Sequence, residues 1–396
     1  MKIALCHPHV QPSKGGCERY ILDLSRRLVR DGHEVQWHAW TWNAQKVPDK
    51  VQCFRVRGPD APWRYRRPWL FGTACLRSLR AVPHDVSMGF DKTWGQDILF
   101  PQGGLYRETA LGNRRVPRTA LGRLLVKCQQ WTDPAYWSFL RLEQRQYGEY
   151  RPAIVVNSQM VRDHFLERFP MARDRLHVVP SAIDPARIRL PAAADCRRRL
   201  RARWQIPAEA TVAVFAAMNY SLKGIGTVLR ALRRLPERLS FFLVVVGHPR
   251  TRGVRLQATW LGVGARLRLL GHKDHIGEIL AAVDLLVHPT FYDPCSLVVL
   301  EALTCGLPVI TSRYNGAGEL PHVRQSGHIL DDPHDERELA RCMEDLCDPA
   351  RRALCARAAQ RAASAWNFEH HYRTLLEVLG KAAAARSRLL HRAGAA

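Results

Sequence analysis

Short apolar runs alternate with segments of helical periodicity through the first half of the chain. Residues 2–6 form an apolar run of strand length, and Ile21, Leu24 and Leu28 then recur at helical spacing before Gly32, a helix-stop signal. A turn is predicted between them at residues 12–16. The same pattern predicts further strands at 34–40, 85–89, 153–157 and 177–179, and a helix at 160–169. The chain therefore opens as a β-α-β unit.

The alternation starts again after a polar stretch that is rich in arginine and alanine. Strands are predicted at 211–216, 241–246, 267–270, 285–288 and 308–311, with helices at 226–235 and 276–282. Nearly continuous apolar strands that alternate with helices imply parallel sheets covered on both faces. The predicted fold class is α/β, with two doubly wound, Rossmann-like domains and a ligand in the crevice at the carboxyl ends of the strands.

The domain boundaries follow from length and composition. A chain of 396 residues is too long for one compact core. We expect a first domain at 1–185, a linker at 186–207 and a second domain at 208–366. A helical pattern predicts a C-terminal helix at about 367–380 that packs back onto the first domain. The basic, alanine-rich tail at 381–396 is expected to fray.

The chain is strongly basic, with a formal net charge of +24. Arginine outnumbers lysine 51 to 9, a ratio that a G+C-rich genome would also produce. Residues 106–147 carry eight basic against three acidic side chains and residues 55–80 carry seven against one, each interleaved with aromatic rings. This combination suits the interface of an anionic membrane, although RNA binding or a merely solvated face would use the same residues. We expect contact with an anionic membrane through both segments and no nucleic-acid partner.

The cysteines and the longest apolar runs indicate the compartment. Eleven cysteines without paired spacing predict free thiols in a reducing environment. The apolar runs are of strand length, and the N-terminus lacks the longer apolar core of a secretory signal. These features predict a cytoplasmic protein, peripherally associated with the inner face of the cytoplasmic membrane.

The segment Asp-Pro-Cys-Ser-Leu-Val-Val-Leu-Glu at 293–301 is the most informative in the chain. Its two carboxylates, Asp293 and Glu301, stand eight positions apart around a predicted change from loop to helix near Ser296. Free backbone N–H groups at the start of that helix could hold a diphosphate, and Glu301 could accept hydrogen bonds from ribose hydroxyls. A capped surface helix would give the same pattern.

Two further loops carry candidate chemistry. Gly15 and Gly16 precede a helix, where the absence of side chains lets backbone amides approach a phosphate or a sugar; a tight connection is the structural alternative. Lys223 is the only lysine between residues 128 and 272. In an arginine-dominated chain it suggests a compact charge for a diphosphate leaving group, although an exposed loop lysine would look the same.

Together these motifs resemble the family 4 glycosyltransferases of the GT-B fold, and most of all the glucosyltransferases that extend the inner core of bacterial lipopolysaccharide. The resemblance runs from the opening strand to about residue 368, and its most specific part is 285–319. It implies two Rossmann-like domains whose parallel sheets face each other across a cleft. The motifs that carry it lie at residues 13–19, 155–158, 178–184, 219–224, 244–247, 293–301 and 305–310.

The resemblance assigns roles to individual positions. It implies catalytic roles for Lys223, Asp293 and Glu301, with Glu301 on the ribose and Asp293 on the hydroxyls of the donor sugar. On the acceptor side it points to Gln102, Gly103 and Gly104. The implied donor-binding set is Gly15, Gly16, Asn219, Lys223, Gly247, Asp293, Ser296, Leu297, Val298 and Glu301.

Three departures from the family pattern bear on the site. Asp293 stands where the family has glutamate, one methylene longer. Ser221 and Leu222 stand where many relatives place an arginine near Lys223. Gln102 stands where relatives often have a histidine, and an amide cannot act as an acid or a base.

The implied reaction is a retaining transfer of a glucose-type hexose from a nucleotide sugar, expected to be UDP-linked. The acceptor would be a lipopolysaccharide core or another lipid-linked or cell-surface glycan. Family chemistry suggests attack on the face that the leaving group departs from, with a donor phosphate oxygen taking the acceptor proton, so no nucleophile is named. No cofactor and no metal are expected, and His7 and His9 are interpreted as turn and packing residues. The alternatives are a sugar-nucleotide epimerase of the same architecture and a non-catalytic basic protein that binds membrane or RNA.

Overall fold

The computed structural model describes residues 1–11, 15–58, 63–170, 173–188, 193–273 and 276–394. The predicted turn at 12–16 lies partly outside the described residues. The chain divides into two compact units. The first comprises Met1–Ala110, Leu125–Pro180 and Glu369–Ala396, and the second comprises Leu111–Leu124 and Ser181–Phe368.

The first unit is built on a parallel seven-stranded sheet in the order β5-β3-β1-β6-β7-β8-β9. The same unit also contains a separate, two-stranded parallel sheet formed by β2 (His9–Val10) and β4 (Thr41–Trp42). The strands of the sheet are β1 (Lys2–Cys6), β3 (Glu34–Ala39), β5 (Val51–Arg55), β6 (Val86–Phe90), β7 (Ile98–Phe100), β8 (Ala153–Val156) and β9 (Leu176–Val178).

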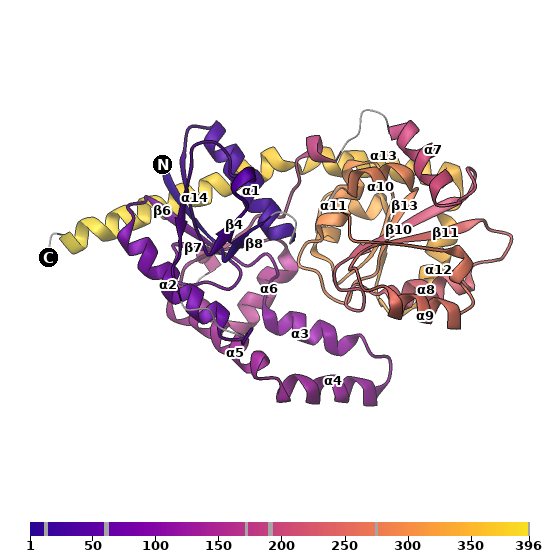
Figure 1. Cartoon of the computed structure of the whole chain (residues 1–396), viewed down its shortest axis with the longest axis horizontal. Coiled ribbons are helices and arrows are strands. Elements are labelled where there is room, and N and C mark those ends of the chain that lie inside the picture. Colours follow the sequence, from indigo (N-terminus) through magenta and orange to yellow (C-terminus); the bar gives the residue numbers. More distant parts are fainter. Residues whose placement is uncertain (12–14, 59–62, 171–172, 189–192, 274–275, 395–396) are drawn as a thin grey trace. The chain divides into compact units, whose positions relative to one another are not determined.

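Helices surround this sheet (Figure 1). Two of them, α3 (Tyr106–Arg115) and α4 (Ala120–Thr132), contribute residues to both units, because the segment between them groups with the second unit. The others are α1 (Gly16–Arg30), α2 (Arg67–Ala81), α5 (Pro134–Glu143), α6 (Gln159–Arg168) and α14 (Phe368–Gly394), with the short 3-10 helices η1 (Ala44–Lys46) and η3 (Arg173–Arg175) and the π-helix η2 (Gln144–Glu149).

The second unit is built on a parallel six-stranded sheet in the order β12-β11-β10-β13-β14-β15. Its strands are β10 (Thr211–Ala217), β11 (Phe241–Gly247), β12 (Leu267–Gly271), β13 (Leu285–His288), β14 (Val309–Ser312) and β15 (Gly327–Leu330). Its helices are α7 (Ala193–Arg203), α8 (Ile225–Arg234), α9 (Arg252–Trp260), α10 (Ile276–Ala282), α11 (Leu297–Thr304), α12 (Glu336–Asp345) and α13 (Pro349–Ala365), with short turns η4 (Pro185–Arg187), η5 (Gly264–Arg266), η6 (Gly316–Glu319) and η7 (Val323–Gln325).

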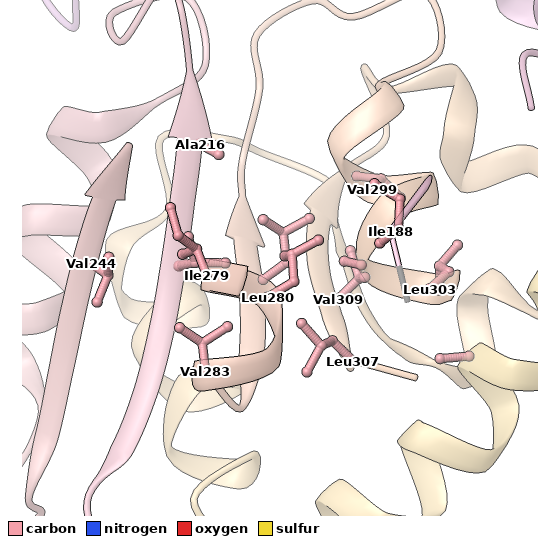
Figure 2. Close-up of a cluster of buried hydrophobic side chains, with 14 of the residues drawn as sticks. Ile188, Ala216, Val244, Ile279, Leu280, Val283, Val299, Leu303, Leu307 and Val309 are labelled. Carbon is pink, nitrogen blue, oxygen red and sulfur yellow. The ribbon is translucent and has the colours of Figure 1, made fainter. Parts of the chain in front are cut away.

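The central strand β10 shows why this sheet is covered on both faces. Val212 and Val214 belong to one hydrophobic cluster, whereas Ala213 and Phe215 belong to another. Successive side chains of a strand point to opposite faces, so an uninterrupted apolar strand needs a core on each side. Figure 2 shows part of the first cluster, where α10 and α11 lie against the strands. The predicted fold class of two doubly wound α/β domains is confirmed.

The expected linker at 186–207 is wrong, because most of its described part belongs to the core of the second unit. It contains η4 and helix α7, and Cys196, Leu200 and Trp204 are buried in the first cluster, as is Ile188 before the helix (Figure 2). Cys196 and Leu200 stand four residues apart on one face of α7, and Trp204 follows four residues later, directly after the helix ends. The surrounding arginines obscured that period in the sequence.

The expected frayed tail is also wrong, since α14 continues as helix to Gly394. Alanine and arginine are both strong helix formers, so the composition that suggested fraying supports the helix instead. Within the first unit, Tyr20 hydrogen-bonds the ring of His371 (2.7 Å), and Arg386 pairs with Asp97 at 3.3 Å. Among the described residues, no helix is both long enough and apolar enough to cross a membrane.

Candidate functional site

The site in the second unit lies where the order of the strands reverses. From β10 the chain proceeds through β11 to β12 on one side of the sheet, and then returns to β13 on the other side. The loops after β10 and β13 therefore leave adjacent strands in opposite directions, which opens a crevice at their carboxyl ends. The predicted donor-site residues on these two loops are consequently neighbours.

The loop after β10 presents Lys223. The Asn219 side chain accepts a hydrogen bond from the backbone N–H of Leu222 (3.2 Å), and its carbonyl accepts one from the N–H of Lys223 (3.1 Å). Gly224 then adopts a φ of +87°, and a Cβ at this position would lie 2.2 Å from the carbonyl oxygen of Pro289. The loop turns this tightly against the loop after β13 only because residue 224 has no side chain.

Lys223 reaches across to the loop after β13 and pairs with Asp293. Its Nζ donates to Asp293 Oδ2 (2.7 Å) and to the backbone carbonyl of Tyr292 (2.9 Å). The same carboxylate oxygen lies 3.4 Å from His288 Nε2, at the end of β13. The side chains of Lys223 and Asp293 are 18% and 14% exposed, so this ion pair is largely withdrawn from water.

This environment sets the charges of the cluster. Burial alone would raise the pKa of Asp293, but the Lys223 ammonium and the hydrogen bond to His288 outweigh it and hold that pKa well below its usual range. Burial lowers the pKa of His288, against the opposing effect of Asp293. At neutral pH Asp293 is therefore a carboxylate and His288 a neutral imidazole.

Helix α11 begins at this cluster. Ser296 is its N-cap residue and, because its own N–H donates to Asn315 Oδ1 (3.2 Å), its backbone is fixed by the loop after β14. Leu297 and Val298 are the first two helical residues, so their N–H groups have no acceptor within the helix. Val299, three residues in, is fully buried in the first core cluster, which anchors the helix end.

Glu301 is the fifth residue of α11 and is only 8% exposed. It lies one turn beyond the helix N-terminus. Gly247 ends β11 at the same edge of the sheet, with a φ of +122°. A Cβ there would lie 2.0 Å from the carbonyl oxygen of Ala217, so glycine is required for the close approach of the two strand ends.

The remaining predicted residues lie in the first unit. Gly15 is the N-cap of α1 and Gly16 its first residue. The loop of Gln102, Gly103 and Gly104 follows β7. Asp91 Oδ1 accepts a hydrogen bond from the N–H of Gly103 (3.1 Å), and Asn157 donates to the carbonyl of Gln102 (3.0 Å), so the loop is held from two neighbouring strand ends.

Sequence reasoning missed three polar residues that shape these sites. His288 is the last residue of β13 and Asn315 follows β14 in the second unit, and Asp91 follows β6 in the first. Each stands at or just after the carboxyl end of an apolar strand, which is the position where α/β proteins bind ligands. Their position at the end of a strand was the signal in the sequence that could have identified them.

Replacing Gly224 with alanine is expected to destabilise the protein by about 3 kcal/mol or more, because the left-handed backbone and the contact with Pro289 both oppose a side chain. Gly262 is the matched control: its φ is +73° but nothing lies within 4 Å of a Cβ. Gly262→Ala should therefore cost only about 1–2 kcal/mol. Urea unfolding measures the stability of both variants. Equal losses of unfolding free energy would contradict the crowding at Gly224.

The ion pair predicts a particular pH dependence of stability. Because the folded state holds the pKa of Asp293 below its usual range, its contribution is complete above the ordinary value of about 3.9 and is lost as pH falls below it. The difference in unfolding free energy between wild type and Asp293→Asn should shrink by up to about 1.4 kcal/mol per pH unit in that range. Urea unfolding between pH 5 and pH 2.5 is the measurement. A difference in unfolding free energy that stays constant over this range would contradict the pairing of Asp293 with Lys223. Asp195→Asn, at a carboxylate that is 71% exposed, serves as control.

Comparison with known proteins identifies the class. Residues 197–364 match the family described as "Glycosyl transferases group 1". The D-inositol 3-phosphate glycosyltransferase of Salinispora tropica is 31% identical over 97% of this chain and 86% of its own length. The lipopolysaccharide glucosyltransferase WaaG of Escherichia coli K12 is 24% identical over 82% of this chain and 84% of its own length.

The solved structures agree in fold. The crystal structure of WaaG, described as a glycosyltransferase involved in lipopolysaccharide biosynthesis, has a TM-score of 0.79 at 21% identity and covers 95% of this chain and 99% of that chain. The structure of Anabaena Alr3699/HepE in complex with UDP-glucose has a TM-score of 0.70 at 19% identity, covering 96% of this chain and 100% of that chain.

The fold and the relatives define an enzyme, a glycosyltransferase of the GT-B fold. The chain belongs to the family of glycosyl transferases group 1, and among these it resembles WaaG.

Proposed function

We propose that this enzyme is a family 4 glycosyltransferase that moves a glucose-type hexose from a UDP-sugar, with retention and without a metal ion. The acceptor would be a lipopolysaccharide core or another lipid-linked or cell-surface glycan. The observation that carries the proposal is the Lys223–Asp293 pair at the N-terminus of α11, with Glu301 one turn into the helix.

The chemistry of this site matches a nucleoside diphosphate sugar. The N-terminal N–H groups of α11 and the Lys223 ammonium offer positive charge to a diphosphate. Glu301 offers two acceptor oxygens to a ribose diol. The UDP-glucose bound to Alr3699/HepE and the glucosyl transfer named for WaaG support a UDP-linked glucose-type donor.

The charges favour a mechanism in which the protein supplies position and electrostatic stabilisation. The departing diphosphate gains negative charge, which Lys223 and the helix N-terminus would stabilise. Asp293 is a weak base because Lys223 and His288 lower its pKa. A phosphate oxygen of the donor is then the better acceptor for the proton of the incoming hydroxyl, which delivers that hydroxyl to the face that the leaving group departs from and retains configuration.

The test is to incubate the purified enzyme with UDP-, GDP- and ADP-hexoses in chelator and to measure nucleoside diphosphate release. We expect slow release from one UDP-hexose and a faster rate with a lipid-linked glycan acceptor. An isomerised nucleotide sugar without release would indicate an epimerase. Absence of both turnover and nucleotide binding would favour a non-catalytic basic protein, and either result would overturn the proposal.

We further propose that the enzyme works in the cytoplasm on an anionic membrane surface, and helix α4 supports this. None of its residues is buried, and Leu121, Leu124 and Leu125 share one face, with Leu121 66% exposed. Lys127 lies over the ring of Trp131 at 4.8 Å. An exposed apolar face flanked by cations and an aromatic ring is typical of a helix that lies in a membrane interface.

The described first-unit parts of the two basic segments predicted to contact the membrane lie side by side. Trp69 donates to Ser138 Oγ (2.9 Å), and Ser138 in turn donates to the carbonyl of Tyr65 (3.0 Å). Between them is an open cavity of about 500 Å³. Three arginines and two aromatic rings line this cavity, and Glu149 adds one carboxylate. The excess of positive charge suits an anionic headgroup. The arginines and the aromatic residues are Arg66, Arg141, Arg145, Tyr65 and Trp69.

The double substitution Leu121→Glu and Leu125→Glu is expected to weaken binding to anionic vesicles at least about tenfold, because it removes apolar area and adds like charge. Co-sedimentation with phosphatidylglycerol-containing vesicles measures the effect. Leu256→Glu is the matched control, since Leu256 on α9 is 61% exposed outside this face. Equal binding by the double variant and the control would argue against α4 as the contact.

A further inference from the structure

A second polar cluster lies at the strand-order reversal of the first unit. From β1 the chain proceeds to β3 and β5 on one side and returns to β6 on the other. His7 follows β1, Cys17 is the second residue of α1, and Asp91 follows β6. One ligand atom from each lies within 4.8 Å of the others, and no other group of three such residues occurs within the described part of the chain.

The hydrogen bonds of His7 orient its ring for coordination. Its Nδ1 lies 2.7 Å from the carbonyl oxygen of His9 and 3.3 Å from the backbone nitrogen of the same residue. The shorter contact is favourable when Nδ1 carries the proton and donates it to the carbonyl. The Nε2 lone pair is then free for a cation. A metal-ligating histidine usually donates its other N–H to a carbonyl or a carboxylate in this way, which fixes both tautomer and ring orientation.

The carboxylate of Asp91 is also fixed in place. Its Oδ1 accepts the N–H of Gly103, and its backbone carbonyl accepts a hydrogen bond from the Gln146 side chain. A carboxylate has about four lone-pair positions, so these contacts leave acceptor capacity for a cation. The residue itself adopts a positive φ of +51°, which the hydrogen bonds on both sides hold.

The surrounding charges favour a cation at this point in an otherwise basic chain. The carboxylates of Asp91 and Glu18 both lie close enough to Cys17 to act on it electrostatically, and Asp91 is also its hydrogen-bond partner.

We propose that His7, Cys17 and Asp91 bind one transition-metal ion of the Zn²⁺ class, with water in the fourth position. Nitrogen, sulfur and oxygen ligands in this combination suit tetrahedral Zn²⁺, and three protein ligands leave one position open. Ligand atoms of such a site lie roughly 3.3–3.8 Å apart, so the three side chains close by up to about 1.5 Å on binding. The site is built from first-unit residues alone, and Asp91 also holds the loop of Gln102, Gly103 and Gly104.

Cobalt provides a direct probe, because Co²⁺ replaces Zn²⁺ and reports sulfur ligation by a near-ultraviolet charge-transfer band. Titration of the reduced, chelator-treated full chain should show one saturable equivalent with this band and with tetrahedral visible absorption, both lost on adding Zn²⁺. Cys17→Ser should abolish the band, and His7→Gln and Asp91→Asn should each weaken binding at least tenfold. Zn²⁺ should also raise the melting temperature of wild type but not of Cys17→Ser.

The control is Cys128→Ser, which removes an exposed thiol on α4 and should leave the Co²⁺ spectrum unchanged. Melting curves measured without metal show whether each variant is folded. If one variant is unfolded, metal binding by the other two tests the proposal. The proposal is overturned if no saturable Co²⁺ binding occurs, if the charge-transfer band persists in Cys17→Ser, or if the folded variants bind as tightly as wild type.

Discussion

Replacing Lys223 with alanine is expected to lower the rate of nucleoside diphosphate release about 1,000-fold, equivalent to about 4 kcal/mol. The ammonium would stabilise the charge that develops on the leaving diphosphate. Its loss also leaves Asp293 buried without the partner that lies 2.7 Å away, so a carboxylate would repel the diphosphate. The assay is release from the preferred nucleotide sugar, measured on variants that melt like wild type.

The pairing of the two residues makes this prediction more specific. If part of the loss arises from the uncompensated charge of Asp293, then adding Asp293→Asn to Lys223→Ala should restore part of the rate. Lys273→Ala is the matched control, because Lys273 is exposed. A Lys223→Ala rate within tenfold of wild type would contradict the assignment of Lys223 to the leaving group.

Replacing Glu301 with glutamine is expected to weaken binding of UDP about 100-fold, or about 2.7 kcal/mol. A buried carboxylate can accept from both hydroxyls of a ribose at once, whereas an amide presents one acceptor and a mismatched donor. Calorimetric titration with UDP measures the change directly, without requiring the acceptor.

A deoxy ligand separates the ribose contact from a general loss of structure. Wild type should bind 2′-deoxy-UDP much more weakly than UDP, whereas Glu301→Gln should discriminate little between them, as a double-mutant cycle requires for two groups in contact. The matched control is Glu278→Gln at an exposed position of α10. If Glu301→Gln binds UDP within threefold of wild type, the carboxylate does not hold the ribose.

Several strongly patterned elements were predictable from sequence, because burial of each strand or helix face follows its local period. The strand at 285–288 and the change from loop to helix at Ser296 are found at the predicted positions. One short strand and one exposed helix were not predicted. Strand β7 has three residues, too few to show alternation, and α4 presents apolar side chains on a surface instead of a core.

The sequence alone determined the alternation of strands and helices, the two-domain class and the loops that carry candidate chemistry, because these depend on nearest neighbours along the chain. Only the tertiary structure decided which loops meet. Lys223 and Asp293 are 70 positions apart, and they pair because β10 and β13 are adjacent at the point where strand order reverses. The same geometry brings His7 and Cys17 to Asp91 in the first unit. A local pattern reports which face is buried, whereas the contact between two distant loops depends on strand order in the sheet, which no single segment encodes.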